Sequence, residues 1–139
     1  MANKIASGID LVEEIEGHGY AAEKGDKLIY NARLFLHRGD EVTWDAGVIE
    51  REREHVTSRM MEGVEVIDHV TVLGKRHTMA GIEKSLYAMR AGGYREIIVA
   101  PHLAYRDEGL PGLIPPRAMI RVRLWVQEIV KARDIGPLV

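Results

Sequence analysis

Alternating apolar and polar residues near the end of the chain predict a half-buried strand over 118–126. Every second residue there is apolar, and the residues between them include two arginines, with a glutamine next in the same register at position 127. A two-residue period is that of a strand whose side chains point alternately to the two faces of a sheet. The apolar set is Ala118, Ile120, Val122, Leu124 and Val126.

Further strands are predicted over 27–36, 64–72 and 94–100. The first has Leu28, Tyr30 and Leu34 on one face, and the second has valines on one face with His69 and Thr71 on the other. The residues over 9–16 fit a short helix as well as a strand. Periodicity therefore leaves that segment undecided.

One helix is predicted from about Ala80 to Ala91. Ile82, Leu86 and Met89 recur at intervals of three and four residues, and two glycines at 92–93 end the pattern. Such a stripe indicates a face packed against a core.

The loop over 101–117 is rich in proline and glycine, residues that restrict or extend the backbone conformations available, and we expect it to have a defined shape.

Composition indicates a soluble protein with a single domain spanning residues 1–139. The net charge is −2 with both signs interspersed, which argues against a nucleic-acid surface. The start of the chain has no apolar run long enough for a signal peptide or membrane span, and there is no cysteine, so we expect a cytoplasmic protein without disulfides. The six histidines are scattered, and Gly17-His18-Gly19 suits a turn better than a phosphate loop. We therefore predict no metal and no cofactor.

The segment 103–124, LAYRDEGLPGLIPPRAMIRVRL, resembles the signature of the FKBP-type peptidyl-prolyl isomerases, A-Y-G-x-x-G-x-P-x-I-P-P-x-A-x-L-x-F-x-V-x-L. The adjoining block over 72–101, VLGKRHTMAGIEKSLYAMRAGGYREIIVAP, is similar to the strand, central helix and next strand of that family. A weaker likeness over 11–45 favours a strand for the segment that periodicity left undecided. The resemblance implies an α+β fold, in which an antiparallel, curved half-barrel sheet of five to six strands wraps around one short α-helix.

The residues over about 46–63 form an insertion relative to the compact form of the family. Its mixed charges are typical of a solvated face, and Ile49, Val56 and Met60 would line one side of a helix. Two interpretations stay open. The insertion is either a lid or partner-binding flap, as long insertions often are, or a solvent-exposed excursion.

The resemblance also implies a site. Tyr105 matches a tyrosine whose hydroxyl donates to a bound carbonyl, and Asp45 matches a carboxylate near the twisting bond if the preceding turn has two extra residues. The alternatives are that Tyr105 is a core or rim tyrosine whose hydroxyl is bonded elsewhere, and that Asp45 is only a carboxylate in a turn. Met79 would donate its backbone N–H to the ligand. The remaining substrate-binding residues would be Trp44, Thr78, Ile82, Leu110, Leu113, Ile114 and Val122.

Several departures from the family pattern weaken the expectation of fast catalysis. Rings common in the family are absent at Ala32, Ile82 and Val122, Leu110 stands where histidine is frequent, and Arg106 stands where glycine is usual. His69 and His77 also bring polar groups to the rim of the expected pocket.

The resemblance implies a weak peptidyl-prolyl isomerase (rotamase) that acts on exposed X-Pro bonds and assists protein folding. The alternative is a weak or inactive FKBP-fold module that binds peptides or proteins. Expected partners are proline-containing peptides or client proteins, with a macrolide ligand if the pocket is open, and neither nucleic acid nor membrane.

Overall fold

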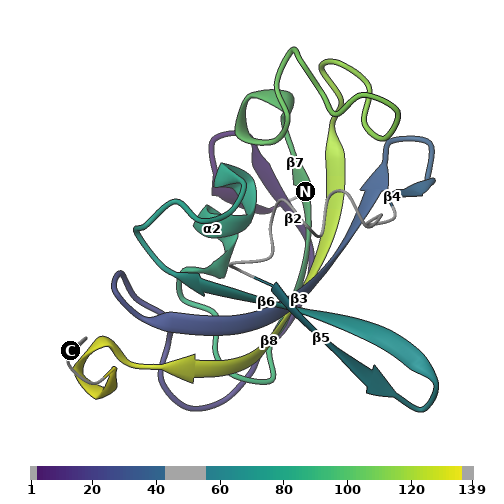
Figure 1. Cartoon of the computed structure of the whole chain (residues 1–139). Helices are drawn as coiled ribbons and strands as arrows, with labels where there is room; N and C mark the ends of the chain where they lie inside the picture. Colours follow the sequence, from purple (N-terminus) through teal and green to yellow (C-terminus); the bar gives the residue numbers. More distant parts are fainter. Residues whose placement is uncertain (1–2, 43–55, 136–139) are drawn as a thin grey trace.

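The computed structural model describes residues 3–42 and 56–135. In these ranges the chain forms one curved antiparallel sheet that packs against a short helix, α2 (Ala80–Leu86) (Figure 1). The strands are β1 (Asn3–Ala6), β2 (Ile9–Ile15), β3 (Lys27–Leu36), β4 (Glu41–Val42), β5 (Val56–Met61), β6 (Val64–Val72), β7 (Tyr94–Val99) and β8 (Ile120–Val130). Two 3-10 turns, η1 (Pro101–Leu103) and η2 (Ala132–Asp134), follow β7 and β8.

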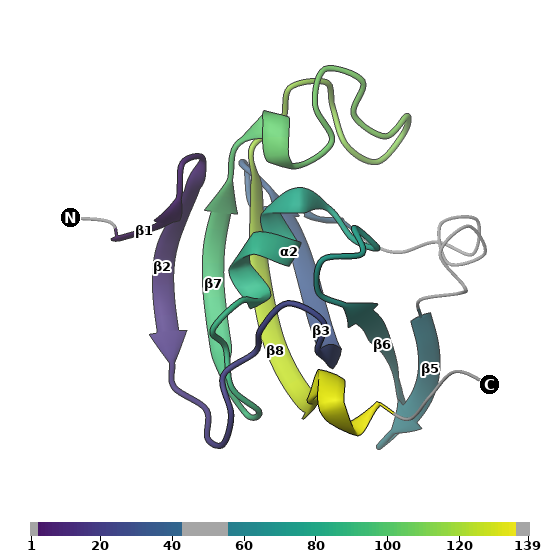
Figure 2. The same cartoon turned by 90° about the vertical axis from the view of Figure 1, so that its left-hand side faces the viewer.

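The sheet has the order β1-β2-β7-β8-β3-β6-β5, with β4 paired to β3. The segment over 9–16 is thus a strand, β2, in an antiparallel pair with β7. Figure 2 shows α2 lying across the concave side of the sheet. In the described residues, the curved antiparallel sheet and the short helix α2 confirm the predicted fold class. The expected five to six strands were too few, because β1 and β5 extend the sheet at its two edges.

Paired residues of β3 and β8 place the apolar sides of both strands on the concave face. Leu34 lies opposite Val122 and Ala32 opposite Leu124, and antiparallel partners point to the same face. These faces meet α2 and form the core with Ile82 and the fully buried Leu86. The alternation read from the sequence therefore identified the buried side of both strands.

The face of β6 that carries His69 and Thr71 is the buried one. His69 pairs with Tyr30 and Thr71 with Leu28, so both side chains share the concave side with the core residues of β3. The valines of the opposite face are half-buried or exposed where they are described. Strand β6 thus places the imidazole of His69 in the interior.

The helix ends at Leu86, and the predicted end at Ala91 is wrong. Ala88 has a left-handed backbone, with φ at 67°, and its N–H donates to the carbonyl of Ala22. The N–H of Ala22 donates in turn to the carbonyl of Met89, at 2.8 Å. Long-range pairing with the segment before β3 therefore replaces the helical hydrogen bonds, while Met89 keeps its place in the core.

The described half of the insertion is a strand, so the predicted helix through Val56 and Met60 is wrong; Ile49 lies outside the described residues. β5 and β6 form a hairpin whose turn residues, Glu62 and Gly63, have φ of 50° and 81°. Two consecutive left-handed residues suit a tight hairpin turn. The hairpin projects from the sheet (Figure 1), and Met60 near its tip is 69% exposed.

Arg121 and Arg123 lie on the convex face, as predicted, with side chains 47% and 41% exposed. Both guanidinium groups lie 3.4 Å from a carboxylate oxygen of Glu96. In the part of the chain that the structure describes, no helix is long and apolar enough to cross a membrane.

Candidate functional site

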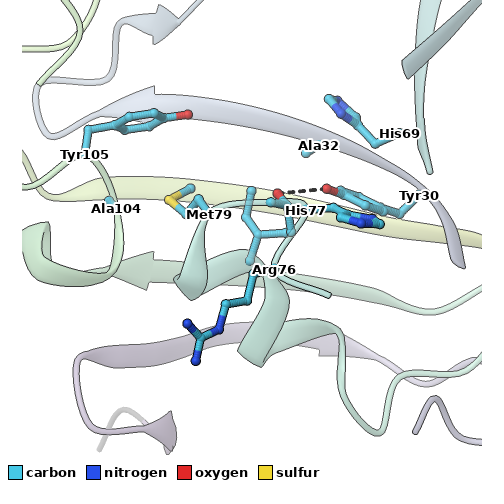
Figure 3. A pocket seen from close by; sticks show the side chains of 10 residues that line it. Tyr30, Ala32, His69, Arg76, His77, Met79, Ala104 and Tyr105 are labelled. Carbon is cyan, nitrogen blue, oxygen red and sulfur yellow. Dashed lines mark hydrogen bonds between the residues drawn. The ribbon is translucent and has the colours of Figure 1, made fainter. Parts of the chain in front are cut away.

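A cavity of about 210 Å³ opens between the concave face of the sheet and α2. Strand β3 supplies two of its lining residues, β6 one, the segment before α2 four, α2 one and the loop after β7 two (Figure 3). They are Tyr30, Ala32, His69, Arg76, His77, Thr78, Met79, Ile82, Ala104 and Tyr105.

Tyr30 fixes one end of the cavity. Its side chain is 2% exposed, and its hydroxyl donates a hydrogen bond of 3.0 Å to Oγ1 of Thr78 (Figure 3). The Tyr30 ring stacks on the imidazole of His69 with the ring centres 5.1 Å apart and the planes 18° apart. This end of the cavity is therefore an ordered aromatic pair attached to the segment that leads into α2.

His69 is uncharged at neutral pH. Burial lowers the pKa of its imidazole to about 4, although the neighbouring Asp68 carboxylate acts in the opposite direction. Desolvation dominates because the residue is only 6% exposed. The aromatic end of the cavity thus carries no charge under physiological conditions.

Tyr105 stands at the other end of the cavity, with its hydroxyl directed toward the interior (Figure 3). Its carbonyl accepts a hydrogen bond from the N–H of Gly109 at 3.0 Å, and Arg106 donates its N–H to the carbonyl of Pro101 at 2.8 Å. These bonds hold the loop after β7 in a compact turn. A phenol therefore faces the cavity from a loop with a fixed backbone.

Met79 is the N-cap residue of α2. Its carbonyl accepts a hydrogen bond from the N–H of Glu83 at 3.0 Å, and its own N–H donates to no other described residue. The first N–H groups of a helix have no partner within the helix. A backbone donor is thus present beside the cavity, as the sequence prediction for Met79 requires.

Four residues predicted for the site lie together around the cavity: Thr78, Met79, Ile82 and Tyr105. Four others do not line it. Val122 and Ile114 are 0% and 3% exposed within the core, while Leu110 and Leu113 are half-buried against it. Trp44 and Asp45, the predicted wall and carboxylate, lie outside the described residues.

A sequence model of the FKBP-type peptidyl-prolyl cis-trans isomerases matches residues 19–121. The chain belongs to this family. It is similar to peptidyl-prolyl cis-trans isomerase FKBP11 of Bos taurus, with 38% identity over 80 residues, and to FKBP9 of Rattus norvegicus, with 31% identity over 62 residues. These matches cover 50% and 45% of this chain but only 38% and 11% of the two relatives.

Solved FKBP structures share the fold. The N-terminal domain of FKBP42 from Arabidopsis thaliana superposes with a TM-score of 0.68 at 19% identity, and covers 94% of this chain and 93% of its own. FkpA from Escherichia coli gives a TM-score of 0.64 at 22% identity, with 94% of this chain and 52% of that chain covered. At sequence identities of 19% and 22%, the similarity to these structures shows a shared fold alone.

The cavity has an aromatic ring two residues before Ala32, where the resemblance led us to expect one. Tyr30 and Ala32 both line the cavity from the same face of β3, and Tyr30 carries the phenol. Sequence reasoning placed His69 and His77 at the rim of the pocket, and both line the cavity. It missed Tyr30, although the alternation had already put Tyr30 on the inner face. At the other two positions where the resemblance led us to expect rings the side chains are aliphatic: Ile82 lines the cavity and Val122 is enclosed in the core.

Proposed function

We propose that this chain catalyses cis–trans isomerisation of X-Pro peptide bonds exposed on client proteins. The proposal rests chiefly on the cavity, which has Tyr30 and Tyr105 at two ends with Met79 between them and is also lined by Ile82. Its volume of about 210 Å³ lies below the roughly 300–1,000 Å³ of sites for drug-sized ligands. A prolyl residue suits it better than a whole macrolide.

Isomerisation breaks no covalent bond, so the site needs neither a nucleophile nor a cofactor. The barrier of about 18–20 kcal/mol is the loss of amide resonance, and each tenfold acceleration requires about 1.4 kcal/mol. A planar amide has more charge separation than a twisted one. Transfer from water to the uncharged end of the cavity beside Tyr30 and His69 would therefore destabilise the ground state more than the transition state.

In this proposal two groups orient the substrate. The hydroxyl of Tyr105 can donate to a substrate carbonyl at one end, and the N–H of Met79 can donate to a second carbonyl beside α2. Neither group transfers a proton. Tyr105→Phe should lower kcat/KM by no more than about tenfold, because it removes one neutral hydrogen bond of about 0.5–1.5 kcal/mol.

The test is an isomerisation assay with a Leu-Pro tetrapeptide, together with refolding of a protein whose slow phase is limited by proline. We expect both rates to rise in proportion to the concentration of this chain. Acceleration of neither process, at concentrations where the peptide is bound, would exclude the isomerase.

The second candidate is a module that binds peptides or client proteins without useful turnover. Two observations favour it: aliphatic residues at 82 and 122, and the apolar tip of the β5–β6 hairpin, where Met60, Met61 and Val64 are 69%, 52% and 64% exposed. Exposed apolar clusters often mark protein contacts. Replacing the three by serine or threonine would abolish client binding, and leave peptide turnover unchanged, if the hairpin is the contact surface.

A further inference from the structure

A basic groove adjoins the cavity on the side of α2. It has a volume of about 760 Å³ and runs between β1, α2 and the loop after β7. Arg76 and Thr78 line both the cavity and the groove, so the two hollows share a rim. A peptide with its proline in the cavity could therefore place a neighbouring residue in the groove.

Three basic side chains line this groove, namely Arg76, Lys84 and Arg106, against one acidic side chain, Glu83. The carboxylate of Glu83 already accepts backbone hydrogen bonds from Gly74 and Arg76, at 3.3 and 3.2 Å. Among the described residues, none forms an ion pair with Arg76, Lys84 or Arg106. Their positive charge is thus available to a ligand.

The guanidinium of Arg76 points away from Tyr30 and Tyr105 and out of the aromatic cavity (Figure 3). It is exposed, as is Arg106. Both groups can present two parallel N–H donors to a carboxylate, the geometry in which arginine binds carboxylates most strongly.

Both arginines have a left-handed backbone, with φ of 58° at Arg76 and 57° at Arg106. Residues with a Cβ adopt this conformation infrequently, and glycine adopts it freely. Such positions tend to cluster at ligand sites. The backbone hydrogen bonds to Glu83 and Pro101 fix the two residues there, so the chain presents guanidinium groups at positions that glycine would fill with less strain.

From these observations we propose that the groove is a specificity subsite that binds the carboxylate of an Asp or Glu within three residues of the substrate proline. The inference rests on the proposed binding of X-Pro segments in the cavity. Because the whole chain has a net charge of −2, long-range attraction does not favour acidic peptides. A preference for them would therefore come from these local charges.

The experiment uses the full chain and matched peptides that differ only by Glu or Gln at each of three positions on either side of the proline. The readouts are the Glu/Gln ratio of kcat/KM and the Glu/Gln ratio of binding affinity, measured at low and high salt. Exposed ion pairs are individually weak, so we expect a preference of about threefold to tenfold for Glu at one position at least. The preference should fall toward one in about 0.5 M salt.

The variants isolate the two guanidinium groups. The double variant, Arg76→Gln with Arg106→Gln, should bring the Glu/Gln ratio close to one. Arg106→Lys alone should keep part of the preference for Glu. Lys75→Gln, an exposed neighbour that lines neither hollow, removes the same charge and should keep the ratio. Should the double glutamine variant fold poorly, Arg106→Gly, which suits the left-handed backbone, serves instead.

The outcomes separate this inference from the isomerase. The subsite is excluded if the chain turns over the peptides with a Glu/Gln ratio of one at every position, or if the ratio is unchanged in the double variant. Neither result excludes the isomerase activity. Absence of turnover with a Glu preference in affinity that the double variant loses supports the subsite and excludes the isomerase.

Discussion

The hydroxyl of Tyr30 on β3 donates a 3.0 Å hydrogen bond to Thr78, which lies 48 residues away in the segment before α2. This bond joins the concave face of the sheet to the helix across the cavity. It also positions the Tyr30 ring against His69. The shape of the site therefore depends on one contact between distant parts of the chain.

Removal of that hydrogen bond should destabilise the fold measurably. Tyr30→Phe is expected to lower the free energy of unfolding by about 0.5–1.5 kcal/mol, because it removes one hydrogen bond and retains the ring. Urea denaturation of Tyr30→Phe, Thr78→Val and the double variant would give the coupling energy of the pair. Additive effects would show that the contact contributes nothing to stability.

Stability should fall with pH below about 6.5 because of His69. The pKa of this imidazole is about 4 in the folded chain against 6.5 for an unperturbed histidine, so the unfolded chain binds the proton more readily. The stabilisation is complete above pH 6.5 and is lost progressively as pH falls to about 4. From 1.36 kcal/mol per pKa unit, its size is on the order of 3 kcal/mol.

The matched variant for this prediction is His69→Phe, which retains an aromatic ring and cannot titrate. Urea unfolding at several pH values from 7 to 4 should give a clearly smaller loss of stability than in the wild type. The carboxylate of Asp68 titrates outside this window: burial acts to raise its pKa, but hydrogen bonds from Arg59 and Asn31 outweigh burial and lower it. Parallel pH profiles for the two proteins would contradict a buried, neutral His69.

Ala88→Gly distinguishes the observed end of α2 from the end predicted from periodicity. Inside a helix, glycine in place of alanine costs about 1 kcal/mol. At the observed φ of 67° glycine removes strain, which offsets the greater freedom that it gives the unfolded chain. We expect the free energy of unfolding to stay equal or to rise by up to about 1 kcal/mol, and a loss of 1 kcal/mol would support the longer helix.

The sequence predicted the strands well because burial on one face leaves a two-residue period, as in β3 and β8. It could not predict the end of α2, because the hydrogen bonds between Ala88, Met89 and Ala22 depend on tertiary pairing. Alternation also shows only that a side chain points inward. Whether it lines a cavity, as Ala32 does, or is enclosed in the core, as Val122 is, depends on the curvature of the sheet and the position of the helix.

The central claim, that the cavity between Tyr30 and Tyr105 isomerises prolyl bonds, is tested most directly by filling it. Ala32 lies on the cavity wall and is half-buried, so Ala32→Trp should occupy the space with little loss of existing core contacts. Turnover of a Leu-Pro peptide should be measurable in the wild type. It should fall at least about tenfold in a folded Ala32→Trp variant, because a substrate residue displaced from the cavity loses more than about 1.4 kcal/mol of transition-state stabilisation. Equal turnover by the wild type and the filled variant would contradict the account.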